Sequence, residues 1–169
     1  MNIKDLLDKY INDNLTHEKF LKQKISFREC ACSSYINSDS EYQEELNVED
    51  YITKNKVDNK FQKLLFKYID ERELKDSEVY NKVNIDRRLF SKIRSDENYH
   101  PSKETVILLG FALKLNEDEL LSLLESASYS LPKNNIFDLI IRFCFINEIY
   151  NINDVNELLF EHKCKILNQ

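Results

Sequence analysis

The chain has 169 residues, of which 42% are hydrophobic and 32% are charged, so it can bury a core and is not globally disordered. One glycine and two prolines exclude glycine-rich phosphate loops and argue against a sheet protein, whose turns need more of these residues. A formal net charge of −6 confines any nucleic-acid-binding surface to a local basic patch on an acidic body. We therefore expect an all-α fold.

The sequence contains no stretch close to the ~18 consecutive apolar residues of a membrane span. The first ten residues, MNIKDLLDKY, lack the apolar core of a signal peptide. We therefore expect a cytoplasmic protein with no membrane partner.

The four cysteines are Cys30, Cys32, Cys144 and Cys164, and no two of them form a Cys-x-x-Cys pair. We expect reduced thiols that pack as small hydrophobes. A zinc site that combined Cys30 and Cys32 with His17 would have poor ligand spacing. We predict no metal and no cofactor.

Residues 1–57 are predicted to form a helical N-terminal extension that ends in an acidic linker. One helical face over 3–13 carries Ile3, Leu6, Leu7, Tyr10 and Ile11. The pattern then predicts a second short helix over 16–24, and Ser26 with Glu29 has the spacing of a capping box for a third.

Residues 37–50 carry six acidic and no basic side chains, so we interpret them as a solvated connector. A DNA-mimicking or partner-binding segment is the alternative for this stretch. For the helices before it, the alternatives are a degenerate second DNA-binding module and a partner-binding or dimer-forming extension.

Residues 58–169 are denser in apolar side chains and are predicted to form one domain with seven helices. The amphipathic stretch FQKLLFKYIDERE begins it at Phe61. Polar residues mark the next helix starts: Asp76 or Ser77, Asp86, Ser102 after Pro101, Asn116 with Glu119, and Asn153. Asn84 is predicted to turn the chain between the second and third of these helices. The sixth, IFDLIIRFCFINE, is apolar on nearly all sides and must be buried in the fold or by a partner.

Two consecutive stretches carry a family resemblance: LKDSEVYNKVNIDRRLFSKIRSD, and then YHPSKETVILLGFALKLNEDELLSLL. They resemble the Cro/C1-type (XRE) helix-turn-helix family over about 61–127, without a gap from Leu74 to Leu120. Further matches to the family pattern are the capping site Asp76–Ser77, Asn84 at the tight turn, Asp86, Pro101, Gly110, Leu113, Leu115 and the run Asp118–Leu120. Three segments also resemble segments of uncharacterised bacterial and phage-borne proteins that end in this module: RRLFSKIRS, YHPSKET and FDLIIRF.

The resemblance implies a five-helix DNA-binding domain, with two further C-terminal helices here. It implies base-reading positions at Arg87, Arg88, Ser91 and Lys92. Backbone amides near Ser77 would bind one phosphate, and Lys103 would lie along the duplex backbone. Three residues depart from the pattern: Asp96 and Glu97 stand in the loop where the family usually meets phosphate, and Arg94 stands at a position that is often acidic in the family.

The leading hypothesis is a sequence-specific DNA-binding transcriptional regulator, a repressor of the prophage or mobile-element type. A homodimer would read a palindrome in double-stranded DNA, with the sixth and seventh helices as its contact surface. The alternative is a protein-binding accessory, immunity or inhibitor protein of phage–host conflict that uses the same scaffold and its N-terminal segment. No catalytic order of His with Cys or Ser occurs, so we do not expect an enzyme.

Overall fold

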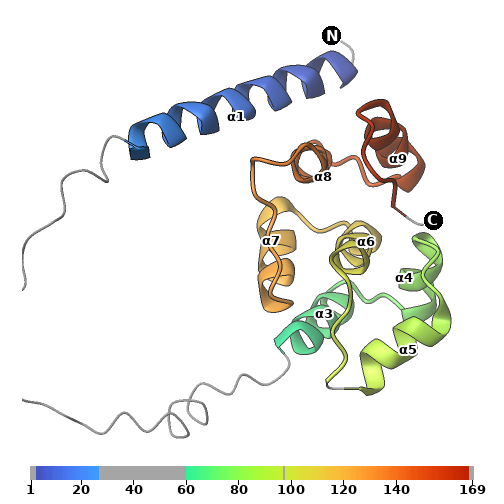
Figure 1. The fold of residues 1–169 in the computed structure, drawn as a ribbon. Coiled ribbons are helices and arrows are strands. Elements are labelled where there is room, and N and C mark those ends of the chain that lie inside the picture. Colours follow the sequence, from blue (N-terminus) through green and yellow to red (C-terminus); the bar gives the residue numbers. More distant parts are fainter. Residues whose placement is uncertain (1–2, 27–59, 97, 168–169) are drawn as a thin grey trace, which may run out of the picture.

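The computed structural model describes residues 3–26, 60–96 and 98–167, with the backbone alone for 16–26 and 60. The expected all-α class is confirmed for these residues, among which no strand occurs. The helices are α1 (Ile3–Ser26), α3 (Lys60–Glu71), α4 (Asp76–Lys82), α5 (Arg87–Ser95), α6 (Lys103–Leu113), α7 (Glu117–Ser126), α8 (Ile136–Ile146) and α9 (Ile152–Glu161) (Figure 1). The predicted acidic linker, the boundary after residue 57, Glu29, Cys30 and Cys32 lie outside the described residues.

Most of the predicted helix starts match. The side chains of Asp86, Ser102 and Asn116 cap α5, α6 and α7, and Asn116 forms the expected capping box with Glu119. Each of these caps satisfies a backbone N–H of the first turn that has no partner within its helix.

Two starts and one break were predicted wrongly. Helix α4 begins after Lys75, whose N–H donates to the Glu78 carboxylate at 3.0 Å, so Asp76 and Ser77 lie inside the first turn. The N-cap of α9 is Asn151, two residues before the predicted Asn153. Helix α1 is continuous where two helices were expected, since no glycine or proline interrupts residues 3–26.

Helix α6 lies at the centre of the packing, against α4 and α7, and all of its residues from Thr105 to Leu113 are buried (Figure 1). Gly110 permits the close approach of its neighbours. A Cβ atom at this position would lie 2.7 Å from Leu120 Cδ1 and 3.2 Å from Phe145 Cζ. The single glycine of the chain therefore stands where α6 meets α7 and α8.

Helix α8 is buried within the chain, which explains why it is apolar on nearly all sides. Helix α1 packs on it with Leu7 and Ile11 in the core, and the Tyr10 ring lies 5.6 Å from the Phe143 ring. Lys4 pairs with Glu157 and Glu161 of α9, which joins α1 to the C-terminal helices as well. The N-terminal helix is thus part of the same core.

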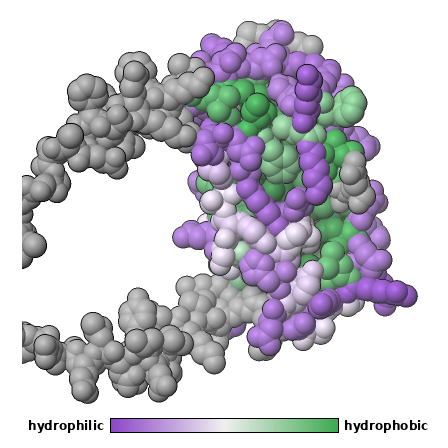
Figure 2. Space-filling model, in the orientation of Figure 1, coloured by the Kyte–Doolittle hydropathy of each residue, from purple (hydrophilic) through white to green (hydrophobic). Residues whose placement is uncertain are grey.

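Polar residues cover most of the face seen in Figure 2, with apolar patches exposed between them. The exposed large apolar side chains in the described part of the chain are Ile3, Leu6, Ile136, Ile146 and Phe160. No described helix is both long and apolar enough to cross a membrane.

Candidate nucleic-acid interface

Helices α4 and α5 are joined by a tight turn at Asn84. Its φ of 51° lies in the left-handed region, as the sequence predicted. Asparagine adopts this backbone at lower cost than other residues with a Cβ atom. After the turn, Ile85 is buried and its N–H donates to the Tyr80 carbonyl at 2.9 Å. This contact sets the direction in which α5 leaves α4.

Helix α5 is anchored by one apolar face. Phe90 and Ile93 are each only 2% exposed, and Leu89 is half-buried. The Phe90 ring packs against Phe66 of α3 and Tyr80 of α4, with ring centres 6.2 and 5.7 Å away. The opposite face of α5 must therefore point to solvent.

That opposite face carries the predicted base-reading residues, Arg87, Arg88, Ser91 and Lys92, and all four are exposed. Within the described residues, neither Arg87 nor Arg88 forms a side-chain hydrogen bond or an ion pair. The Lys92 ammonium lies 4.7 Å from the centre of the Tyr99 ring, a cation–π contact that leaves its charge uncompensated.

Two shallow hollows bring five of the six predicted site residues onto one surface. The first is lined by Arg87, Arg88, Ser91, Lys92 and Ser95. The second lies between α4 and α5 and is lined by Lys75, Asp76, Ser77, Tyr80, Arg87, Phe90, Ser91 and Arg94. We call Ser77, Arg87, Arg88, Ser91 and Lys92 the cationic face.

Lys103, the sixth predicted residue, is engaged elsewhere. Its ammonium donates to Asp138 Oδ1 of α8 at 2.6 Å, and the Asp138 side chain is only 2% exposed. No sequence pattern signals this pair, because 35 residues separate its members. The pair holds the start of α6 against α8.

Of the two acidic residues that depart from the family pattern, only Asp96 has a hydrogen bond that the structure describes. Asp96 Oδ1 accepts a hydrogen bond from the Asn98 N–H at 3.0 Å, so this carboxylate shapes the loop after α5. Glu97 lies outside the described residues. Sequence reasoning missed Asp76 and Lys75 as neighbours of the cationic face, and only the pairing of α4 with α5 reveals them.

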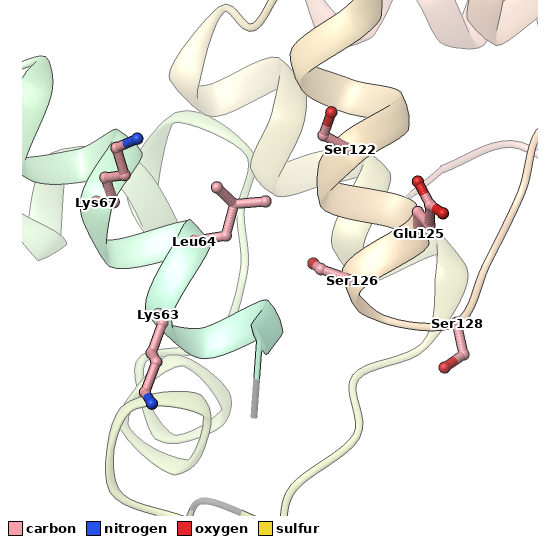
Figure 3. A pocket seen from close by; sticks show the side chains of 7 residues that line it. All are labelled: Lys63, Leu64, Lys67, Ser122, Glu125, Ser126 and Ser128. Carbon is pink, nitrogen blue, oxygen red and sulfur yellow. The ribbon is translucent and has the colours of Figure 1, made fainter. Parts of the chain in front are cut away.

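A third hollow, between α3 and α7, is a weaker candidate. Its lining residues are Lys63, Leu64, Lys67, Ser122, Glu125, Ser126 and Ser128. Figure 3 shows the ammonium groups of Lys63 and Lys67 pointing in opposite directions along α3. Lys67 also lies 3.6 Å from the Glu71 carboxylate. The charges do not converge, so this hollow has no evident ligand chemistry.

The residues described in the structure include no group of three side chains that could hold a metal ion. No protein-family model, curated protein or solved structure matches the chain. The cationic face is therefore interpreted from its own geometry and from the family resemblance of the sequence.

Proposed function

We propose that the protein is a sequence-specific DNA-binding regulator, a repressor of the prophage or mobile-element type with a Cro/C1-like domain over α3–α7. The observation that carries the proposal is the state of Arg87 and Arg88. Both stand exposed in the first turn of α5, without an acidic partner in the described part of the chain, on a helix whose other face is anchored.

The major groove of B-DNA is ~12 Å wide and admits an α-helix whose N-terminal side chains reach the base edges. An arginine fork pairs with the O6 and N7 atoms of guanine, and each good pair contributes ~1–3 kcal/mol of discrimination. Arg87 and Arg88 supply two such forks, and Ser91 and Lys92 follow one turn later on the same face. Helix α5 is therefore the proposed recognition helix.

Phosphate contacts would come from the rim of the same surface. Ser77 is exposed in the first turn of α4, and Lys75 lies beside it in the hollow between α4 and α5. A role for Lys103 at the duplex backbone stays a prediction, and its bond to Asp138 makes a smaller contribution the expected outcome. With a net charge of −6, binding should be modest in strength and sensitive to salt.

Two copies would read a palindromic site with half-sites ~34 Å apart. The dimer contact was expected on α8 and α9. Since α1 already covers part of α8, the exposed apolar side chains left on these two helices are Ile136, Ile146 and Phe160. Phe160, which is 76% exposed, is the first of these to substitute in a test of dimerisation.

A second candidate function is a protein-binding accessory, immunity or inhibitor protein in phage–host conflict. It is favoured by α1, which exposes Ile3 and Leu6 beside the buried Leu7 and Ile11. In that case α1 would bind a protein partner through its exposed apolar residues, and the cationic face would not bind nucleic acid.

The test is fluorescence anisotropy on a labelled random duplex and on heparin, at 50 mM and ~200 mM salt, a range over which phosphate binders lose affinity steeply. The regulator should bind at the lower salt, and Arg87→Ala with Arg88→Ala should abolish binding. The matched control is Lys133→Ala with Lys163→Ala, which removes the same charge at exposed sites elsewhere.

Absence of binding by the unaltered protein at 50 mM salt would overturn the proposal and favour the second candidate. An equal loss in the control pair would also contradict it, because binding would then follow total charge and not the cationic face.

A further inference from the structure

Arg94, the fourth cation of α5, does not share the environment of the other three. Its Nη2 atom lies 2.5 Å from Asp76 Oδ1 at the start of α4. Its guanidinium carbon lies 4.0 Å from the centre of the Phe66 ring of α3. Its backbone carbonyl accepts a hydrogen bond from Gln62 Nε2 at 2.9 Å. One residue thus joins the end of α5 to both neighbouring helices.

The contact with Phe66 continues into the core. The Phe66 ring meets the Phe90 ring edge-on, at an interplanar angle of 85°. Phe90 is a buried residue of α5 beneath the cationic face. Phe90, Phe66 and Arg94 therefore form a continuous row of contacts from the core to the edge of that face. Loss of the guanidinium would remove the side-chain contacts of Arg94 with α3 and α4, and the last turn of α5 would be held by Ile93 and the Gln62 hydrogen bond.

The contact with Asp76 has an electrostatic consequence. Asp76 lines the same hollow as Ser77, Arg87 and Ser91. A carboxylate with no partner there would repel a phosphate and attract the Arg87 guanidinium away from a base edge. Arg94 compensates that charge at hydrogen-bond distance.

We propose that Arg94 is a positioning residue for the cationic face: it holds α5 against α3 and α4 and compensates Asp76, without contacting nucleic acid itself. This role rests on the proposed function, because it concerns the presentation of the same surface to DNA. It also gives a reason for an arginine at a position that is often acidic in the Cro/C1-type pattern that the sequence resembles.

The first experiment compares the salt dependence of duplex binding for Arg94→Gln and for Lys75→Gln, since Lys75 is a proposed phosphate contact. Each phosphate contact contributes about −0.9 to the slope of log K against log salt. For a positioning role, Arg94→Gln should weaken binding by up to about tenfold and leave the slope unchanged; the upper limit applies if one surface ion pair and one cation–π contact serve entirely to hold α5 in its binding orientation. Substitution of a residue that contacts phosphate would make the slope less steep, and Lys75→Gln, at the rim of the cationic face, calibrates the size of that change.

The second experiment is a charge exchange. Arg94→Asp alone places two carboxylates together and should remove most of the binding. Addition of Asp76→Arg restores the pair and the net charge, and should bring affinity back to within about threefold of the unaltered protein, the residual loss reflecting the altered stack on Phe66. Far-UV circular dichroism at the assay temperature verifies that every variant is folded.

An exchange variant that binds no better than Arg94→Asp, or a reduced slope in Arg94→Gln, overturns the positioning role alone. Failure of the unaltered protein to bind duplex overturns the proposed function, and this role falls with it. Urea unfolding of the unaltered protein, Arg94→Asp, Asp76→Arg and the exchange variant then still measures the coupling between Asp76 and Arg94.

Discussion

The cationic face and the junction of α6 with α8 use the same type of side chain in opposite ways. On α5, Lys92 is exposed and its ammonium lies over an aromatic ring. At the start of α6, the Lys103 ammonium is hydrogen-bonded to the buried carboxylate of Asp138. Both lysines belong to helices that bury apolar residues, so residue type and helical position alone do not distinguish them.

This difference shows that the role of a charged residue depends on its burial and on the groups it contacts. A buried carboxylate whose partner is removed is costly, because it loses water and gains nothing in exchange. An exposed cation costs the fold little, so it is free to serve binding. The junction of α6 and α8 is therefore expected to dominate stability, and the cationic face to dominate function.

The largest expected effect is that of Lys103→Met. It leaves Asp138 buried without its partner and should lower the free energy of unfolding by about 3 kcal/mol. Urea unfolding followed by circular dichroism measures it. The matched control, Lys92→Met, loses only the cation–π contact with Tyr99 and should lower stability by no more than about 1 kcal/mol.

Lys103→Met combined with Asp138→Leu should recover most of the loss, because an apolar pair replaces the ion pair. Equal effects of Lys103→Met and Lys92→Met would erase the distinction between the two regions.

An intermediate effect on stability is expected from ionisation of the Cys144 thiol, which is fully buried in α8. Burial raises the pKa of its thiol from 9.0 to about 12. The folded protein therefore keeps this proton at pH values where the unfolded chain releases it. The resulting stability is complete below pH 9 and is lost as the pH rises toward 12, by up to about 1.4 kcal/mol per pH unit.

The measurement is urea unfolding at pH 9 and pH 10 under reducing conditions. The unaltered protein should lose about 1 kcal/mol more over this interval than Cys144→Val, which has no thiol to ionise. Cys164→Val is the comparison, and it should give a smaller difference because Cys164 is only half-buried. Parallel pH dependence in the unaltered protein and Cys144→Val would show that the Cys144 thiol is open to water.

The smallest effect concerns the turn that orients the cationic face. Asn84→Ala should lower the free energy of unfolding by about 1 kcal/mol, because alanine tolerates the left-handed backbone poorly. Asn84→Gly should leave it nearly unchanged. Asn81→Ala, an exposed helical position three residues earlier, is the control and should be neutral. A destabilising glycine variant would mean that the asparagine side chain, and not the backbone, matters at this turn.

Local patterns were sufficient for much of the fold. The caps at Asp86 and Asn116 and the turn at Asn84 depend on atoms a few residues apart, so the sequence contains the whole interaction. The inward positions of Phe90 and Ile93 follow from helical periodicity in the same way. The start of α4 was placed one or two residues too late, because a glutamate that reaches back to Lys75 competes with the expected capping side chains.

The sequence was sufficient to predict which residues of α5 share its exposed face. It was not sufficient to predict which residues of other helices surround that face. Periodicity places Arg87, Arg88, Ser91 and Lys92 opposite the buried residues of α5. It gives no sign that Lys103 is bonded to Asp138, 35 residues away, or that Arg94 is bonded to Asp76 in another helix. Ion pairs of this kind form between whichever charges the packing brings together.

The amino-acid sequence alone predicted the all-α class, which the described residues confirm, and an amphipathic, basic helix at 87–95, since both properties arise from neighbours along the chain. Packing settled which cations stay available, and it brought α1 onto α8 although residues 27–59 separate α1 from the next described helix. The physical reason is distance along the chain. Backbone hydrogen bonds and caps act over a few residues, whereas burial and charge pairing depend on which helices come to lie against one another.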